Sequence, residues 1–283
     1  MITFNQLGSY GRLGNQLFQY AILKSVSLKT GYEIMLPENV YSRRWHGQKC
    51  PLDNFILKSA KLGSVNVSNH FNEPTVDMIL DGKRFHPKVY EIKDNTNFLG
   101  WFQSPKYYED IKNELIDEIQ LKDKFVNYAN EYLSKFNNTT VSLHVRRGDV
   151  SDGTNRGCEW ANDFSENSIQ FKYYSKVLSL IPKDSTILLF TGGNRNNDLK
   201  SDLEWCKEKF NDDRIIFVEE LDEIRTFALM TKVDINIMGF KSTFSWWGSF
   251  LNKNSVVYAP KNFNPTRMDI GPELVYPSDW IIV

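Results

Sequence analysis

The sequence predicts an α/β protein built on parallel sheets and organised in two domains. Segments of strand and helix character alternate along most of the chain, a pattern typical of parallel sheets covered on both faces. The chain has 283 residues, which is enough for two domains of ordinary size. Hydrophobic residues make up 41% of it, so each domain can bury a core.

The first domain is expected over residues 1–137 and opens with a βαβ unit. A short strand over residues 1–4 precedes a helix over residues 15–30, whose apolar residues share one stripe and which Gly31 caps. The rest of the domain is predicted as a strand over residues 32–36, an irregular stretch over 38–100, a strand running into a helix over 98–121 and a helix over 123–136.

The second domain is expected over residues 138–283, after the polar stretch NNTT. Strands and helices alternate throughout it, which again indicates a parallel sheet. The strands are predicted over residues 140–145, 185–190, 214–218, 234–239 and 255–260, and the helices over 173–181, 221–232 and 244–252.

Composition excludes several classes of function. The formal net charge is -1 and the pI about 6.5, so no global field attracts nucleic acid or an anionic membrane. The N-terminus lacks a secretion signal, and no apolar run approaches the roughly 20 residues of a membrane span. We expect a cytoplasmic protein whose three cysteines are reduced structural thiols, because no zinc-binding spacing appears.

A glycine-rich loop follows the first strand. Gly8, Gly11 and Gly14 are spaced G-x-x-G-x-x-G, which is neither the dinucleotide fingerprint nor a P-loop. The glycines either make a tight turn or let the backbone approach a ligand at the start of the helix. The second interpretation is favoured by polar residues that suit a sugar, namely Arg12, Asn15 and Gln16.

Polar side chains gather at the end of the strand in "VSLHVRRGDV". Alternation places Arg147 on the apolar face and Arg146 with His144 on the other. Ligands of open α/β sheets bind beyond the carboxyl ends of strands, and a guanidinium suits a phosphate. We therefore predict that Arg146 meets a phosphate, while Arg147 pairs with Asp149 or holds the turn. Structural salt bridges at a domain interface are the alternative.

A serine-rich turn precedes the helix in "KSTFSWWGSFLN". Ser242, Thr243 and Ser245 are suitable N-cap residues, and the free amides at that helix end suit a diphosphate. Phe244 lies in the turn, where its ring can stack on a nucleobase. Trp246 forms an i,i+4 pair with Phe250 and is predicted to pack in the core.

Together, "GRLGNQLFQYA", "HVRRGD" and "STFSWWG" resemble the bacterial α-1,2-fucosyltransferases of glycosyltransferase family 11, in order and spacing over nearly the whole chain. The resemblance implies a GT-B architecture, in which two Rossmann-like domains face each other across a cleft. It places the acceptor at the domain of residues 1–137 and the nucleotide sugar at the domain of residues 138–283.

The resemblance also implies a reaction. An inverting, metal-independent transferase would move L-fucose from GDP-fucose to the 2-hydroxyl of a terminal β-galactoside, without a cofactor. By position, the resemblance assigns Arg146 to the donor pyrophosphate with His144 beside it. It assigns Ser242, Thr243 and Phe244 to the phosphate and guanine, and Gly14 and Asn15 to the fucose and acceptor side.

The candidates from the resemblance and from the motifs themselves are then as follows. The candidate catalytic residues are Arg146, His144 and Asp149. The candidate donor-binding residues are Arg146, Arg147, Ser242, Thr243, Phe244 and Ser245. The candidates on the acceptor and fucose side are Arg12, Gly14, Asn15 and Gln16.

Two departures from the family pattern leave the choice of donor open. Gly192 and Gly193 stand where the family has Ser-Asp-Asp, and Lys241 stands where it has Asn. A different nucleotide sugar, or a nucleotide-sugar-binding protein without turnover, remains an alternative. A nicotinamide oxidoreductase ranks last because the fingerprint is missing. Asp149 is either the general base, with Asp152 as an alternative base, or a structural partner of Arg147.

The natural acceptor is not determined by these motifs. The polar and aromatic residues of the stretch over 38–100 are candidates for that choice: Arg43, Arg44, Trp45 and His46. The expected partners are GDP-fucose and a β-galactoside, with no nucleic acid and no transmembrane segment. Peripheral association with a membrane through a lipid-linked acceptor stays open.

Overall fold

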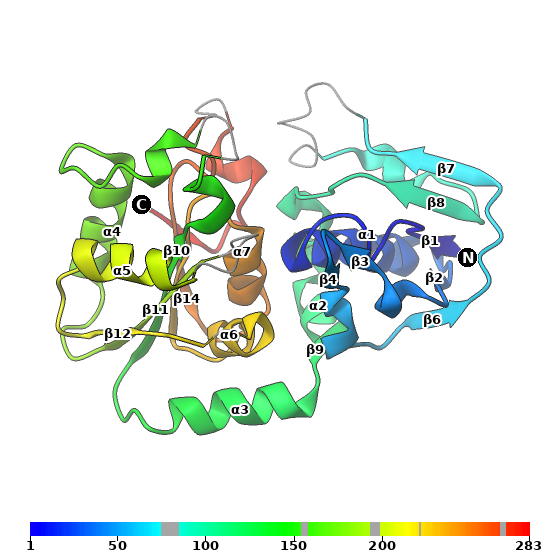
Figure 1. Cartoon of the computed structure of the whole chain (residues 1–283). Helices are drawn as coiled ribbons and strands as arrows, with labels where there is room; N and C mark the ends of the chain where they lie inside the picture. Colours follow the sequence, from blue (N-terminus) through cyan, green and yellow to red (C-terminus); the bar gives the residue numbers. More distant parts are fainter. Residues whose placement is uncertain (75–84, 154–157, 193–198, 221, 267–269) are drawn as a thin grey trace. The chain divides into compact units, whose positions relative to one another are not determined.

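The computed structural model describes the whole chain except residues 75–84, 154–157, 193–198, 221 and 267–269. Contacts divide it into unit 1, Met1–Lys122 with Glu273–Pro277, and unit 2, Asp123–Pro272 with Ser278–Val283 (Figure 1). This division falls earlier than the predicted boundary at residue 137, because helix α3 (Asp123–Leu133) packs against α6 (Glu223–Met230) of unit 2.

Unit 1 is built on a parallel sheet. Its strands run in the order β6 (Ala60–Gly63), β2 (Ile34–Pro37), β1 (Ile2–Thr3), β8 (Thr96–Leu99) and β7 (Asn69–Asn72). Helix α1 (Leu13–Thr30) joins the parallel neighbours β1 and β2, which confirms the predicted βαβ unit. Gly31 ends α1 with φ 76°, as a left-handed cap.

Strand β1 lies inside the sheet of unit 1, between β2 and β8. The chain moves from β1 outwards to β2 and β6, and then enters the other side at the edge strand β7 before it reaches β8. Because β1 and β8 are parallel neighbours, their carboxyl ends lie at the same edge of the sheet. The glycine loop follows β1 at this edge, and the segment beginning at Gly100 follows β8.

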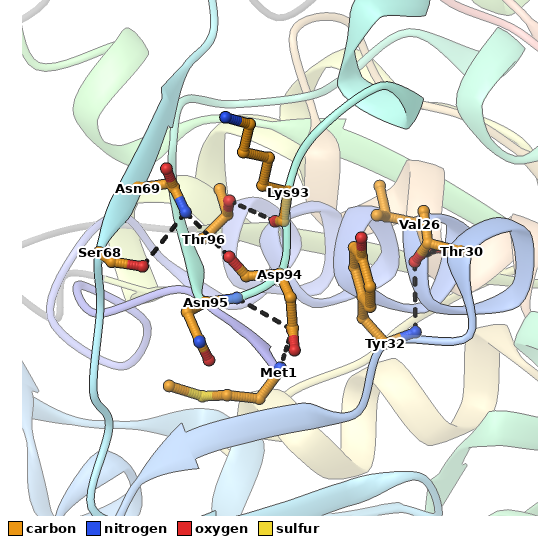
Figure 2. A network of polar contacts seen from close by, with 10 residues as sticks. All are labelled: Met1, Val26, Thr30, Tyr32, Ser68, Asn69, Lys93, Asp94, Asn95 and Thr96. Carbon is orange, nitrogen blue, oxygen red and sulfur yellow. Dashed lines mark hydrogen bonds and ion pairs between the residues drawn. The ribbon is translucent and has the colours of Figure 1, made fainter.

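Polar contacts hold the opposite edge of this sheet, where β1, β7 and β8 begin (Figure 2). The Asp94 carboxylate accepts a hydrogen bond from the Asn95 amide at 2.9 Å and pairs with the amino group of Met1. The Asn69 amide group donates to the Asp94 carbonyl at 2.9 Å. These contacts hold together the starts of the strands, at the edge opposite the loops that follow their carboxyl ends.

Smaller elements complete unit 1. They are the antiparallel hairpin of β3 (Arg44–Trp45) and β4 (Gln48–Lys49), the antiparallel pair of β5 (Phe55–Leu57) and β9 (Ile119–Leu121), and helix α2 (Lys112–Glu118). The segment over residues 98–121, predicted as a strand running into a helix, thus begins in β8 and contains a helix shorter than expected. Pro105 begins a 3-10 turn. Helix α2 ends at Glu118, whose buried carboxylate accepts hydrogen bonds from the Tyr20 hydroxyl and the Ser59 amide.

Unit 2 contains a second parallel sheet. Its order is β12 (Ile215–Phe217), β11 (Thr186–Gly192), β10 (Thr140–Arg146), β13 (Ile235–Ile237), β14 (Val256–Ala259) and β15 (Ile281–Ile282). Helices α4 (Ile169–Leu180) and α5 (Leu199–Lys209) cover one face, while α6 and α7 (Thr243–Phe250) cover the other (Figure 1). A topological switch point lies between β10 and β13.

The core of unit 2 forms where these helices meet the sheet. Val141, Leu143 and Val145 of β10 are fully buried. Trp246 stacks on Phe250 of α7 with ring centroids 4.8 Å apart, which confirms the predicted core pair. The α/β class predicted from the sequence is therefore confirmed, with one parallel sheet in each unit. No helix in the described part of the chain has both the length and the apolar character needed to cross a bilayer.

Candidate functional site

The switch point of unit 2 brings two predicted motifs into contact. Strand β10 ends at Arg146, and the chain that leaves β13 passes over this end through Gly239. A Cβ atom at Gly239 would lie 2.4 Å from His144 Nδ1 and 3.4 Å from the Arg146 nitrogen. Only glycine fits such a close approach, so this position holds the two loops together.

Arg146 is bound to Asp149 at the end of β10. Its Nη2 donates to Asp149 Oδ1 at 2.6 Å, and the two side chains are 16% and 11% exposed. Gly148, with φ 69°, turns the chain back so that Asp149 reaches Arg146. Arg146 Nε is buried and has no hydrogen-bond partner among the described residues. The guanidinium is thus held on one side and keeps donor capacity for an anionic ligand.

Arg147 lies on the other face of β10, as the alternation predicts. Its Nε lies 3.2 Å from an Asp202 carboxylate oxygen, and its Nη1 donates to the Ala161 carbonyl at 2.9 Å. Its guanidinium also covers the Trp205 ring, 3.9 Å from the centroid. The expected pairing of Arg147 with Asp149 is therefore wrong, since Gly148 directs that carboxylate to Arg146. The other expectation, that Arg147 holds the turn, stays a prediction. Its assignment to the donor stays a prediction.

His144 is buried beneath the site. Burial lowers its pKa to about 3, and the positive charge of Arg146 lowers it as well. The imidazole is therefore neutral at neutral pH and adds no charge beside Arg146. Its Nδ1 has no hydrogen-bond partner among the described residues, although it is enclosed. Because the imidazole is neutral, it can orient a ligand group without adding a second charge to that of the Arg146 guanidinium.

The serine turn is built by its own hydroxyls. Ser242 is the N-cap of α7, and its side chain accepts from the Ser245 amide at 3.1 Å. The Ser245 hydroxyl in turn accepts from the Gly239 amide at 3.3 Å. Both serine side chains are buried, so they shape the turn. The amides of Thr243 and Phe244 lie in the first turn, where a helix offers no acceptor of its own.

Phe244 occupies a half-buried position in this turn. Its ring centroid lies 6.1 Å from that of His144 and 5.3 Å from that of Phe227. The ring therefore links α7 to α6 and to the end of β10. The stacking of the Phe244 ring on a nucleobase stays a prediction. Among the described residues, its contacts with other aromatic rings are those to His144 and Phe227.

Gly192 and Lys241, which are expected to depart from the pattern of the family that the motifs resemble, lie at the same edge of the unit 2 sheet. Lys241 has φ 49°, a left-handed conformation that Asn adopts more readily than Lys. Its Nζ lies 3.2 Å from Cys158 Sγ, so the ammonium group is engaged within unit 2. Gly192 pairs in register with Arg146 and has φ 104°. Gly193 lies outside the described residues.

The predicted acceptor-side residues belong to unit 1. Gly8 and Gly11 both have φ 85°, and a Cβ atom at Gly11 would lie 2.7 Å from Asn15 Cβ. The turn therefore requires these glycines, whereas Gly14 lies within α1. Arg12 is the N-cap residue of that helix and is half-buried.

Gln16 supports the loop from below. It is fully buried, its Nε2 donates to the Gly11 carbonyl at 2.8 Å, and its Oε1 accepts from Cys50 Sγ at 3.3 Å. Asn15 is half-buried, and its Oδ1 accepts from Gln103 Nε2 at 3.0 Å. Gln16 thus positions the loop, while Asn15 lies at its accessible side.

Sequence reasoning missed three residues that shape these two sites. Gly239 is predicted only as a strand end, although a glycine directly after a buried strand is a signal of close approach. Tyr10 and Trp101 stack on each other with centroids 4.3 Å apart. Both follow glycine-marked strand ends in unit 1, and that shared position is the signal that could have found them.

No group of three His, Cys, Asp or Glu side chains in the described part of the chain is arranged to hold a metal ion. The expectation of a metal-independent reaction stays a prediction. The three cysteines are buried and free, in agreement with the structural thiols expected from the sequence.

Comparison with known proteins agrees with this picture. The family model of glycosyl transferase family 11 matches residues 2–283. The O-antigen biosynthesis glycosyltransferase WbnK of Escherichia coli is 23% identical, with 89% of this chain and 92% of the relative covered. Galactoside alpha-(1,2)-fucosyltransferase 2 of Oryctolagus cuniculus is also 23% identical, over 97% of this chain and 75% of the relative.

Solved structures show the same fold at low identity. The fucosyltransferase NodZ from Bradyrhizobium aligns with a TM-score of 0.55 and 13% identity, over 88% of this chain and 91% of that one. POFUT1 in complex with GDP aligns with a TM-score of 0.50 and 14% identity, over 90% and 95%. The predicted GT-B architecture is thereby confirmed, and the chain belongs to glycosyl transferase family 11.

Proposed function

We propose that this protein transfers L-fucose from GDP-fucose to the 2-hydroxyl of a terminal β-galactoside, with inversion and without a metal ion. Membership of glycosyl transferase family 11 supports sugar transfer. The name of one relative, galactoside alpha-(1,2)-fucosyltransferase 2, supports fucose as the sugar transferred, a galactoside as acceptor and the linkage. The observation that carries the proposal is the fixed cation of Arg146 at the switch point between β10 and β13.

Arg146 is the group assigned to the diphosphate of the donor. Asp149 holds one edge of the guanidinium, so its remaining N–H groups have a defined direction. The amides of Thr243 and Phe244 at the start of α7 add partial positive charge on the adjacent strand end. Together they would stabilise the negative charge that develops on GDP as the bond to the sugar breaks.

The proposed reaction is a single displacement at the anomeric carbon. The oxygen of the acceptor 2-hydroxyl forms a bond to that carbon while the bond from the carbon to the phosphate oxygen breaks. The bonding electron pair leaves with GDP, and the hydroxyl proton passes to a base. His144 is a weak base because burial holds its pKa low, and Asp149 is engaged with Arg146. We therefore assign both residues to positioning and leave proton acceptance to another group or to solvent.

A donor panel tests the proposal. GDP-fucose, other GDP-sugars and UDP-sugars are each incubated with lactose, with and without EDTA, and products are analysed by mass spectrometry. We expect an added deoxyhexose from GDP-fucose alone, unchanged by EDTA, and an α-1,2 linkage by NMR. Addition of a hexose from another donor, or loss of transfer in EDTA, would overturn the proposal. The panel includes other nucleotide sugars because Gly192 and Lys241 are expected departures from the family pattern that leave the choice of donor open.

A further inference from the structure

We infer that unit 1 carries an aromatic subsite for the sugar ring of the acceptor, formed by Tyr10, Trp45 and Trp101. We call these three residues the aromatic corner. The inference rests on the proposed function and adds to it the residues that bind the acceptor. None of the three belongs to the motifs from which the resemblance to the family was drawn.

The location is the first argument. Strands β1 and β8 are parallel neighbours in the unit 1 sheet, and ligands of open α/β sheets bind beyond the carboxyl ends of the strands. Tyr10 lies in the loop after β1, and Trp101 lies two residues after the end of β8. The two strand ends therefore meet through a pair of aromatic rings at the position where a ligand is expected.

The geometry of the rings is the second argument. Tyr10 and Trp101 stack with centroids 4.3 Å apart and an interplanar angle of 22°. Trp45 meets Tyr10 edge-on, with centroids 5.9 Å apart and an angle of 89°. The two tryptophan rings thus contact the same tyrosine, Trp101 by stacking and Trp45 by its edge, and the three form one continuous aromatic surface.

This surface differs from the core of the same unit. Phe98 and Phe102 are fully buried, whereas all three rings of the aromatic corner are half-buried. Tyrosine and tryptophan also carry a polar group that needs a partner, and phenylalanine does not. An aromatic surface that is partly open and has polar tips is typical of a binding site.

The aromatic corner is held in place by the backbone around it. The Glu73 carboxylate accepts from the amides of Trp101 and Phe102 at 2.7 Å and 3.0 Å. A Cβ atom at Gly11 would lie 3.2 Å from the Trp101 ring, so the loop fits closely against it. Because these contacts are made within unit 1, the surface is formed before any ligand binds.

Trp45 is brought to this place by a short hairpin. His46 and Gly47 have φ values of 46° and 81°, which suit the two-residue turn between β3 and β4. Arg43, at the base of the hairpin, donates to the Leu7 carbonyl at 3.0 Å and so ties it to the glycine loop. Trp45 can therefore be truncated without removing a residue of the main sheet.

The ligand that best matches the aromatic corner is a pyranose ring. A β-galactoside has one face of C–H groups, which packs on an aromatic ring, and hydroxyls around its edge, which need hydrogen bonds. The half-buried amides of Asn15 and Gln103, bonded to each other at 3.0 Å, flank the glycine loop and offer such partners. The other large substrate, the nucleotide, is assigned to unit 2, where the cation lies.

Kinetics of Trp45→Ala test the inference, with lactose as acceptor and GDP-fucose as donor. We expect the KM for lactose to rise about tenfold or more, as for loss of a central aromatic contact, while the KM for GDP-fucose stays within about twofold. Tyr132→Ala is the matched control, because Tyr132 is a half-buried aromatic residue of α3 in unit 2. It should leave both constants unchanged. Trp45→Phe keeps a smaller ring and should give an intermediate KM for lactose.

The outcomes separate this inference from the proposed function. If the wild-type protein transfers no fucose to lactose, the proposed function fails. If it does, and Trp45→Ala leaves the KM for lactose unchanged or alters both KM values together, this inference alone fails. Saturation-transfer NMR with methyl β-galactoside needs no turnover. We expect the signal from the sugar C–H groups to fall strongly in Trp45→Ala and not in Tyr132→Ala, and an equal signal in both would also overturn the inference.

Discussion

Arg146 and Asp149 form an ion pair at the carboxyl end of β10, with Nη2 and Oδ1 2.6 Å apart. Both side chains are largely withdrawn from solvent, at 16% and 11% exposed, so the pair is screened less than a surface salt bridge. The main role of the Asp149 carboxylate is therefore to bind the Arg146 guanidinium. It fixes the guanidinium in one orientation, which is what electrostatic stabilisation of a leaving diphosphate requires.

Asp149→Asn separates a positioning role from a role as general base. Loss of the charge frees the guanidinium, and we expect GDP affinity to fall about tenfold, roughly 1.4 kcal/mol. The acid limb of the pH–rate profile should remain, because its ionising group is elsewhere. Asp149→Glu should recover part of the affinity by restoring a carboxylate. Disappearance of the acid limb with unchanged GDP binding would instead identify Asp149 as the base.

Arg146→Ala tests the assignment of the diphosphate. Loss of one preorganised charge contact costs about 3 kcal/mol in the transition state, so kcat/KM should fall about 100-fold or more. Arg225→Ala is the matched control, since Arg225 also pairs with a carboxylate, Glu220, but is 48% exposed on α6. Its activity should stay close to that of the wild type. Near-normal turnover of Arg146→Ala would contradict the assignment of the donor diphosphate to this residue.

Gly239→Ala probes the contact between the two loops of unit 2. The new Cβ would lie 2.4 Å from His144 Nδ1 and 2.7 Å from the His144 carbonyl oxygen, so the loop must shift. We expect a loss of stability of about 1–3 kcal/mol, with weaker GDP binding. Gly63→Ala is the control, because its Cβ would meet only the flexible Met35 side chain. Similar urea-unfolding midpoints for the two variants would contradict this account of the loop.

His144 gives the protein a dependence of stability on pH. Burial, and then the charge of Arg146, lower its pKa to about 3 from an ordinary 6.5. The unfolded chain therefore binds the proton more readily, so the contribution of His144 is present above pH 6.5 and is lost as pH falls towards 3. His144→Gln cannot titrate. Between about pH 7 and about pH 5, wild type should lose about 2 kcal/mol more unfolding free energy than this variant in urea titrations. Parallel losses in the two proteins would contradict a neutral buried imidazole.

Local sequence patterns predicted the elements that depend on neighbouring residues. The βαβ unit at the N-terminus follows from one apolar stripe and from Gly31, which adopts the left-handed cap that its position suggested. Alternation along β10 is enough to separate Arg146 from Arg147, because successive side chains of a strand point to opposite faces. Ser242 was a suitable N-cap from its chemistry alone, and it caps α7.

Patterns of this kind failed where contacts between distant segments decide the structure. In the strand-to-helix segment predicted over residues 98–121, the helix is shorter than expected because Pro105 begins a 3-10 turn and because Ile119–Leu121 pairs with β5. The predicted boundary at residue 137 and the division by contacts at Lys122 differ by helix α3, which packs on α6. Spacing alone did not reveal that the Gln16 side chain is buried and bonds to Gly11 and Cys50 instead of lying at the surface of the loop.

The sequence by itself determined the α/β class, the family motifs and the face on which Arg146 lies, since these depend on periodicity and on residue type. Only the tertiary structure decided which carboxylate belongs to which arginine. The backbone turn at Gly148, with φ 69°, takes Asp149 to Arg146, and the fold of unit 2 brings Asp202 to Arg147. It also decided that Tyr10 and Trp101 meet, because β1 and β8 are neighbours in the sheet although they are far apart in the chain.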